Sequence, residues 1–145
     1  MAEGTRVMGI DFGMKRVGVA VSDPLRIIAQ GVDTLENNSS LVARVTDIVK
    51  RMSVSKIVVG KPLKLSGQAG DSAMEAAKFG EKLRQRLRSE SLDVDVVEWD
   101  ERFTTTMAHR TQLELGVKKK ERQKKGNLDR MASQLILQSY LDSHK

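Results

Sequence analysis

The beginning of the chain is dominated by a regular alternation of apolar and small residues. In residues 17–22 three valines alternate with a glycine, an alanine and a serine, the period-two pattern of a β-strand. An apolar run at 7–11 predicts another strand, and the short segment between the two suits an antiparallel hairpin. We expect a helix to lie close against the face with the small side chains. A third strand is predicted over 27–35.

The remaining chain alternates helical and strand patterns. A short apolar run at 56–60 and the segment 94–99 predict two further strands, and the first suits a strand buried on both faces. Apolar residues at helical spacing predict four helices, each preceded by a possible N-terminal cap. These helices cover residues 41–52, about 72–89, about 105–116 and 128–141, with caps at Ser39 or Ser40, Asp71 or Ser72, Thr104 or Thr105, and Asn127. The last helix is expected to bury Leu128, Met131, Ala132, Leu135, Ile136 and Leu141.

This order of elements predicts an α/β fold with a mixed five-stranded sheet. A three-strand antiparallel meander is followed by parallel strands, and helices cover both faces. The 145 residues suit one domain, residues 1–145. Ligands of such sheets gather beyond the carboxyl ends of the parallel strands, so polar residues there are the candidates for function.

Composition narrows the classes of function. The chain is 39% hydrophobic and 30% charged, which is typical of a folded protein, and its net charge of +6 suits a polyanionic partner such as nucleic acid. The absence of cysteine excludes disulfides and thiolate metal sites, and two distant histidines, His109 and His144, disfavour a histidine-rich zinc site. No apolar run approaches the ~20 residues of a membrane span, so we expect a cytoplasmic protein without a membrane partner.

Four acids stand where the predicted elements bring chain ends together. Asp11 ends the first strand, Asp100 and Glu101 end the last strand, and Asp129 lies in the first turn of the last helix. Each alone has a simpler interpretation: a turn-forming acid, a surface ion pair, or a partner of the helix dipole. Together, converging carboxylates repel unless cations separate them, and hard oxygen ligands favour Mg²⁺ or Mn²⁺. Such ions can activate water for phosphodiester hydrolysis.

Basic residues accompany these acids. Residues 117–126 form a predicted loop with six cations and one acid, which would suit a phosphate backbone but is also typical of a solvated loop. The basic residues that are candidates for contacting nucleic-acid phosphates are Lys15, Arg16, Arg102, Lys118, Lys119, Lys120, Lys124 and Lys125.

Four blocks of the chain resemble one known family. They are residues 9–13 with 16–23, residues 58–63 with Gly67, residues 100–105, and Asp129 with Ala132, 136–138 and 140–141. In order and spacing they look like the YqgF (RuvX) family of Holliday-junction-resolvase-like nucleases. The resemblance covers essentially the whole chain.

The resemblance implies an RNase H-like fold and a metal-dependent nuclease that matures the 5′ end of 16S ribosomal RNA precursors. Some members of the family are linked to Holliday-junction cleavage. By position, Asp11, Glu101 and Asp129 would be the catalytic and metal-binding acids, and Asp100 a helper. Thr104 and Thr105 would shape the site, and Lys61 and Lys64 would contact backbone phosphates. The implied partners are pre-rRNA or branched DNA and ribosomal precursor particles, bound by a monomer or homodimer.

Two departures from the family pattern leave alternatives open. The loop at 61–67 is more basic than the family pattern, and the last helix offers Asp129 but Ala132 one turn on, where related resolvases have a further acid. A non-catalytic nucleic-acid-binding assembly factor is therefore an alternative. Residues 9–13 also resemble the phosphate-binding opening of actin and sugar-kinase folds, but those need two such domains.

Overall fold

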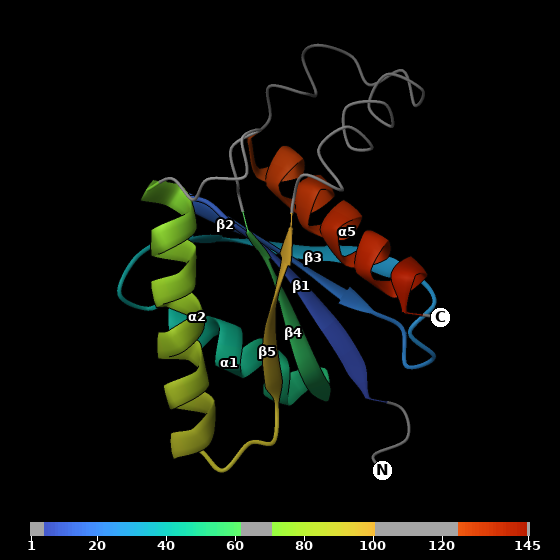
Figure 1. The fold of residues 1–145 in the computed structure, drawn as a ribbon, viewed down its shortest axis with the longest axis horizontal. Helices are drawn as coiled ribbons and strands as arrows, with labels where there is room; N and C mark the ends of the chain where they lie inside the picture. The colour runs from blue at the N-terminus through green and yellow to red at the C-terminus, as the bar shows by residue number, and fades with distance from the viewer. Residues whose placement is uncertain (1–4, 62–70, 101–124, 145) are drawn as a thin grey trace.

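A mixed β-sheet forms the centre of the structure (Figure 1). The computed structural model describes residues 5–61, 71–100 and 125–144, and within them five strands lie in the order β3-β2-β1-β4-β5. These strands are β1 (Arg6–Phe12), β2 (Arg16–Ser22), β3 (Ala29–Glu36), β4 (Val54–Lys61) and β5 (Asp95–Asp100). The first three pair antiparallel, whereas β4 pairs in parallel with β1 and with β5. The predicted meander followed by parallel strands is confirmed.

Helices cover both faces of this sheet (Figure 1). The helices α1 (Leu41–Arg51) and α2 (Asp71–Ser89) pack on one face, and α5 (Lys125–Ser143) packs on the other. The larger core lies beneath α1 and α2 and includes the fully buried Ile10 and Leu83, and the smaller core lies beneath α5. None of the described helices is both long and apolar enough to cross a membrane.

The two faces of the hairpin β1–β2 differ as its alternating pattern predicts. The valines of β2 belong to the larger core, whereas Ala20 lies beneath α5. On the same face of β1, a Cβ placed on Gly9 would lie 2.6 Å from Cβ of Leu137. Carbon atoms pack at ~3.5–4.0 Å, so only glycine allows α5 to approach this closely. The small residues therefore set the depth at which α5 lies, as expected.

The central position of β4 is also confirmed. Ile57 and Val59 belong to the core beneath α1 and α2, and Val58 belongs to the core beneath α5. A strand buried on both faces has no polar side to display, which is why this segment is continuously apolar.

The predicted start of β3 is wrong, whereas α1 begins at Leu41 as predicted but lacks, in the described part of the chain, the expected hydrogen bond from a serine cap. β3 begins at Ala29 rather than Ile27, because the Ile27 N–H donates to Oδ1 of Asp23 at 2.8 Å and belongs to a turn. Ser40 precedes α1, but within the described residues its hydroxyl makes no capping hydrogen bond, since its backbone is helical rather than extended. Oδ1 of Asn38 instead accepts the Ser40 N–H at 2.9 Å.

The last helix differs most from its prediction. It begins at Lys125, so Lys125 belongs to the helix rather than to the basic loop, and Asn127 is not its cap. Its buried residues are Ser133, Ile136, Leu137, Tyr140 and Leu141, whereas Met131, Ala132 and Leu135 are half-buried. Apolar residues lie on several sides of this helix, so the apolar spacing alone did not fix its rotation. The side chain of Leu128 and the predicted helix at about 105–116 lie outside the described residues.

Candidate active site

Asp11 lies at the carboxyl end of β1 between two glycines of the adjoining strands. It is the last residue but one of the strand and is half-buried. Its neighbour in register on β2 is Gly18, and its neighbour on β4 is Gly60. Neither of these neighbours carries a side chain, so the adjoining strands place no side chain beside Asp11 in register. A carboxylate at a strand end can serve as a ligand of a cation.

Asp11 faces the side of the sheet that α5 covers. Side chains alternate along a strand, and both Ile10 and Phe12 belong to the core beneath α1 and α2. The direction of α5 follows from two contacts. Near the start of β1, Lys56 pairs in register with Val7, and its Nζ lies 3.1 Å from the Tyr140 hydroxyl. Farther along the strand, Leu137 lies over Gly9. The helix therefore runs antiparallel to β1, and its first turns lie toward the end of the strand that carries Asp11.

The backbone of α5 places position 129 toward the end of β1 that carries Asp11. Position 129 lies four residues before Ser133 and eleven before Tyr140, so all three share one stripe of the helix. Ser133 and Tyr140 are buried against the sheet, and the Ser133 carbonyl oxygen would be 3.1 Å from a Cβ on Gly9. Position 129 lies one helical turn before Ser133, and Asp11 is the next residue after Gly9 on this face of β1. One helical turn is about as long as this step along the strand, so position 129 lies toward Asp11.

The parallel strands β4 and β5 end at the same edge. Lys61 and Asp100 are the last residues of the two strands and pair in register. Figure 1 shows these strand ends at the same end of the molecule as the beginning of α5. Glu101, the residue after β5, lies outside the described residues, as do Arg102 and the candidate lysines 64, 118–120 and 124. Among the described side chains no three His, Cys, Asp or Glu residues form a group that could hold a metal ion.

The turn between β1 and β2 directly follows the strand end that carries Asp11 and is tightly constrained. A Cβ on Gly13 would lie 2.3 Å from the Arg16 carbonyl oxygen, so a larger residue would force the backbone apart. Asn37 fixes the turn from outside: its side chain donates to the Gly13 carbonyl oxygen at 2.8 Å, and its backbone N–H donates to that of Lys15 at 2.9 Å. Lys15 is exposed here and Arg16 is half-buried. Lys15 therefore lies in the turn and Arg16 at the start of β2, both next to the strand end that carries Asp11.

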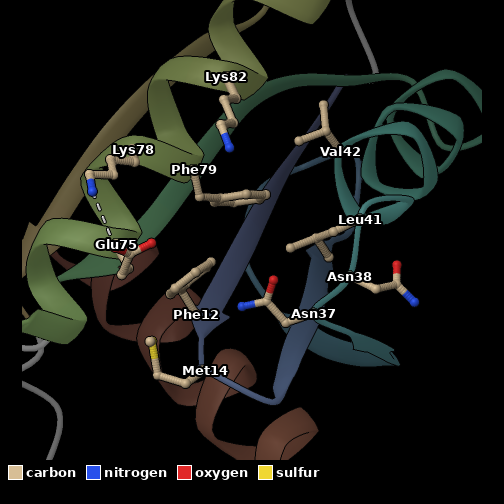
Figure 2. Close-up of a pocket in the computed structure, with 10 residues that line it drawn as sticks. All are labelled: Phe12, Met14, Asn37, Asn38, Leu41, Val42, Glu75, Lys78, Phe79 and Lys82. Carbon is tan, nitrogen blue, oxygen red and sulfur yellow. Dashed lines mark hydrogen bonds and ion pairs between the residues drawn. The ribbon is translucent and has the colours of Figure 1, made fainter.

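A cavity that the sequence did not predict opens beside this turn (Figure 2). Its volume is about 280 Å³, and its lining comes from the end of β1, the β3–α1 loop, α1 and α2. Two of its polar residues are Asn37 and Lys82. No local pattern identifies such a site, because it gathers residues that are far apart in the sequence.

Two carboxylates whose pKa values are lowered lie away from this edge and have structural roles. Backbone N–H groups, first that of Ile28, hold the pKa of Asp23 below its ordinary value, and this acid organises the loop that follows β2. Hydrogen bonds from Lys50 and Arg86 lower the pKa of Glu90, which ties the end of α1 to the end of α2. Neither group adjoins the edge at which Asp11 lies.

The chain is similar to known sequences along nearly its whole length. The family model for RuvX, described as Holliday junction resolvase, matches residues 5–143. A protein of Caldanaerobacter subterraneus subsp. tengcongensis, named "Putative pre-16S rRNA nuclease", is 45% identical over 142 residues, which are 97% of this chain and 98% of that protein. A Bacteroides fragilis protein of the same name is 40% identical over 141 residues, which are 97% and 99% of the two chains.

Solved structures share the fold at low sequence identity. RuvC of T. thermophilus, solved in complex with a Holliday junction substrate, has a TM-score of 0.58 and 14% identity, covering 97% of this chain and 95% of that one. The yeast mitochondrial Holliday junction resolvase has a TM-score of 0.61 and 13% identity, covering 97% and 79%. The expected RNase H-like fold is thereby confirmed.

Proposed function

The chain belongs to the RuvX family of Holliday junction resolvases, and we propose that it is a metal-dependent nuclease that hydrolyses phosphodiester bonds. The observation that carries this proposal is the setting of Asp11. This acid stands at the carboxyl end of β1 between two glycines, and α5 approaches it with the turn that contains Asp129. In an open α/β sheet this is the edge at which ligands bind.

The donor set fits a hard divalent cation. Asp11, Glu101 and Asp129 would hold it, because carboxylate oxygens are the ligands that Mg²⁺ and Mn²⁺ prefer. A bound cation would supply an activated water and charge stabilisation for the leaving oxygen. The residues of the chain would orient the substrate: Lys15, Lys61 and the predicted cations outside the described residues would contact its phosphates. The glycines beside Asp11 would leave room for the scissile group.

A precursor of 16S ribosomal RNA is the substrate that the comparisons favour. Two relatives that carry this name are 45% and 40% identical over nearly the whole chain. The similarity to structures of junction resolvases, at 13–14% identity, concerns the fold. We therefore propose that a single domain of residues 1–145 trims the 5′ end of this RNA in the cytoplasm, on ribosomal precursor particles, and that four-way DNA junctions are a secondary substrate.

Cleavage assays with the full chain test this function. A labelled 16S leader RNA and a synthetic four-way junction are incubated with Mg²⁺, with Mn²⁺ and with a chelator. We expect the RNA to be cut with either metal and not with the chelator. Asp11→Asn should lower kcat at least ~10³-fold, because metal-based charge stabilisation contributes several kcal/mol. Glu101→Gln and Asp129→Asn should behave similarly.

Asp47→Asn is the matched control, since Asp47 is an exposed acid on α1 and lies outside the proposed site. It should cut at the parental rate. If Asp11→Asn also cut at that rate, the assignment of the site would be wrong. Salt-sensitive binding of both substrates without turnover under either metal would show instead a non-catalytic assembly factor.

A further inference from the structure

The cavity beside the β1–β2 turn has an apolar floor and a polar rim. Phe12 and Phe79 lie at its floor with ring centroids 5.2 Å apart, and they are only 8% and 5% exposed. Leu41 and Val42 form a wall opposite these rings (Figure 2). The residues of the floor belong to the packed core, so this surface is preformed rather than assembled by a ligand. It offers a flat apolar group a place to bind.

The rim carries one uncompensated positive charge. Glu75 lies on the rim but pairs with Lys78, whose Nζ is 3.3 Å from its carboxylate. Lys82 forms no ion pair within the part of the chain that the structure describes, and Figure 2 shows its amine directed toward the cavity. An anionic group at the mouth would therefore be attracted to Lys82.

Asn37 supplies a hydrogen-bond acceptor. Its side-chain nitrogen is engaged with the Gly13 carbonyl oxygen, which fixes the orientation of the amide. Its Oδ1 accepts no hydrogen bond from the described residues, and Figure 2 shows it directed toward the cavity. A ligand that satisfies this oxygen must present an N–H or O–H donor beside the apolar floor.

A nucleotide combines these three properties. A nucleobase is flat, stacks on apolar and aromatic surfaces and carries N–H donors at its edge, and its phosphate is anionic. An apolar peptide side chain would leave Lys82 and the Asn37 oxygen without partners, and inorganic phosphate would leave the apolar floor uncovered. The nucleotide must be unpaired, because a base within a duplex cannot expose a face to the floor.

The cavity lies immediately across the end of β1 from the candidate active site. Asp11 and Phe12 are consecutive residues whose side chains point to opposite faces of the sheet. A strand of nucleic acid with its scissile phosphate at Asp11 would reach the cavity after passing only the β1–β2 turn, where Lys15 is exposed. The location thus suits a nucleotide close to the cleaved bond.

We propose that this cavity binds one unpaired nucleotide of the substrate strand, next to the phosphodiester that is cut. This inference rests on the proposed nuclease function and specifies its substrate as a duplex or hairpin with an unpaired nucleotide at the cleavage site. Recognition comes from stacking on the floor, from the Asn37 acceptor and from the Lys82 charge.

Nucleotide titrations of the full-length protein test the cavity without any cleavage. The probes are adenosine 5′-monophosphate, adenosine and inorganic phosphate, and the readout is the NMR signals of the Met14, Leu41 and Val42 methyl groups. The monophosphate should shift these signals more strongly than either fragment. Lys82→Ala should weaken its binding about fivefold, and Val42→Trp, which fills the cavity, should abolish it. Arg88→Ala removes a charge from the same helix outside the cavity and should change nothing.

Binding of a structured RNA tests the proposal on the substrate. The Asp11→Asn protein, expected not to cut, is titrated with a hairpin that has one unpaired nucleotide and with the same hairpin lacking only that base. Loss of the base should weaken binding about tenfold. When Val42→Trp is added, the two hairpins should bind equally.

The two proposals fail in different ways. If the monophosphate shifts none of the three methyl signals, or if the hairpins bind equally without Val42→Trp, the cavity is not a nucleotide site, even if the protein cuts RNA. If the cavity binds nucleotides as described but no substrate is cut with either metal, the nuclease assignment fails and the nucleotide site stands.

Discussion

The close approach of α5 to β1 can be tested by adding a single carbon atom. In Gly9→Ala the new Cβ would lie 2.6 Å from Cβ of Leu137 and 3.1 Å from the Ser133 carbonyl oxygen. Carbon atoms pack at ~3.5–4.0 Å, so the helix must move from the strand by about 1 Å. Neither contacted atom can rotate away, since one is a Cβ and the other belongs to the backbone. Replacing Leu137 by alanine therefore should not relieve the clash.

The displacement should lower the free energy of unfolding. Overpacking of this kind costs ~1–3 kcal/mol, and in a chain of 145 residues each kcal/mol lowers Tm by ~2–4 °C. We expect Gly9→Ala to lower Tm by roughly 3–10 °C in thermal unfolding followed by circular dichroism. Gly80→Ala is the matched control, because among the described residues a Cβ there meets no atom within 4 Å. Gly80 lies inside α2, so alanine should raise stability by ~1 kcal/mol.

The same displacement should reduce cleavage, because α5 carries Asp129. A misplacement of about 1 Å in a catalytic arrangement can cost ~10²-fold in rate. Cleavage of the leader RNA is compared at a temperature at which Gly9→Ala is fully folded, so that stability does not enter. If Gly9→Ala proved as stable as Gly80→Ala, the packing described for α5 would be wrong. If it were destabilised but cut at the parental rate, the position of α5 would not determine the active site.

Two further perturbations probe the ends of the hairpin. The hydrogen bonds that lower the pKa of Asp23 stabilise the fold above the ordinary aspartate pKa of about 3.9, and this contribution is lost as pH falls through the lowered pKa of the folded state. The stability difference between the parent and Asp23→Asn in urea should therefore be larger at pH 7 than at pH 3, and equal differences would refute the role of this acid. Lys15→Ala in the Asp11→Asn background should reduce the slope of log affinity against log salt for RNA by about one unit. Lys50→Ala, at the end of α1 that pairs with Glu90, should leave that slope unchanged.

The parts of the fold that could be predicted are those in which a local residue pattern is compatible with only one type of secondary structure and one buried face. In β2 the alternation of valines with small residues fixes both the strand and the two faces of the hairpin. The run Ile57-Val58-Val59 has no polar side, which indicated a central strand. The position of Asp11 at a strand end follows from the same local pattern. In each case the information lies within a few consecutive residues.

The parts that were missed depend on contacts between distant segments. The rotation of α5 is decided by the sheet beneath it, because the helix itself is apolar on several sides. The start of β3 is decided by Asp23, whose carboxylate accepts hydrogen bonds from the loop. The cavity requires Phe12, Asn37 and Lys82 from three separate elements, and nothing near any one of them indicates the other two.

The end of β1 connects these local and distant features. Strand geometry directs Asp11 to the face of α5 and Phe12 to the face of the cavity, so the two sites lie on opposite faces of the sheet at the same end of β1. Gly13 and Asn37 then prevent the adjoining turn from adopting another conformation, through a backbone contact that excludes a Cβ and a hydrogen bond of 2.8 Å. A substrate held in the cavity would therefore be held at a fixed distance from the acid. Such positioning costs no rearrangement at the time of reaction, which is how an enzyme places one particular bond of a long, uniform polymer at its catalytic groups.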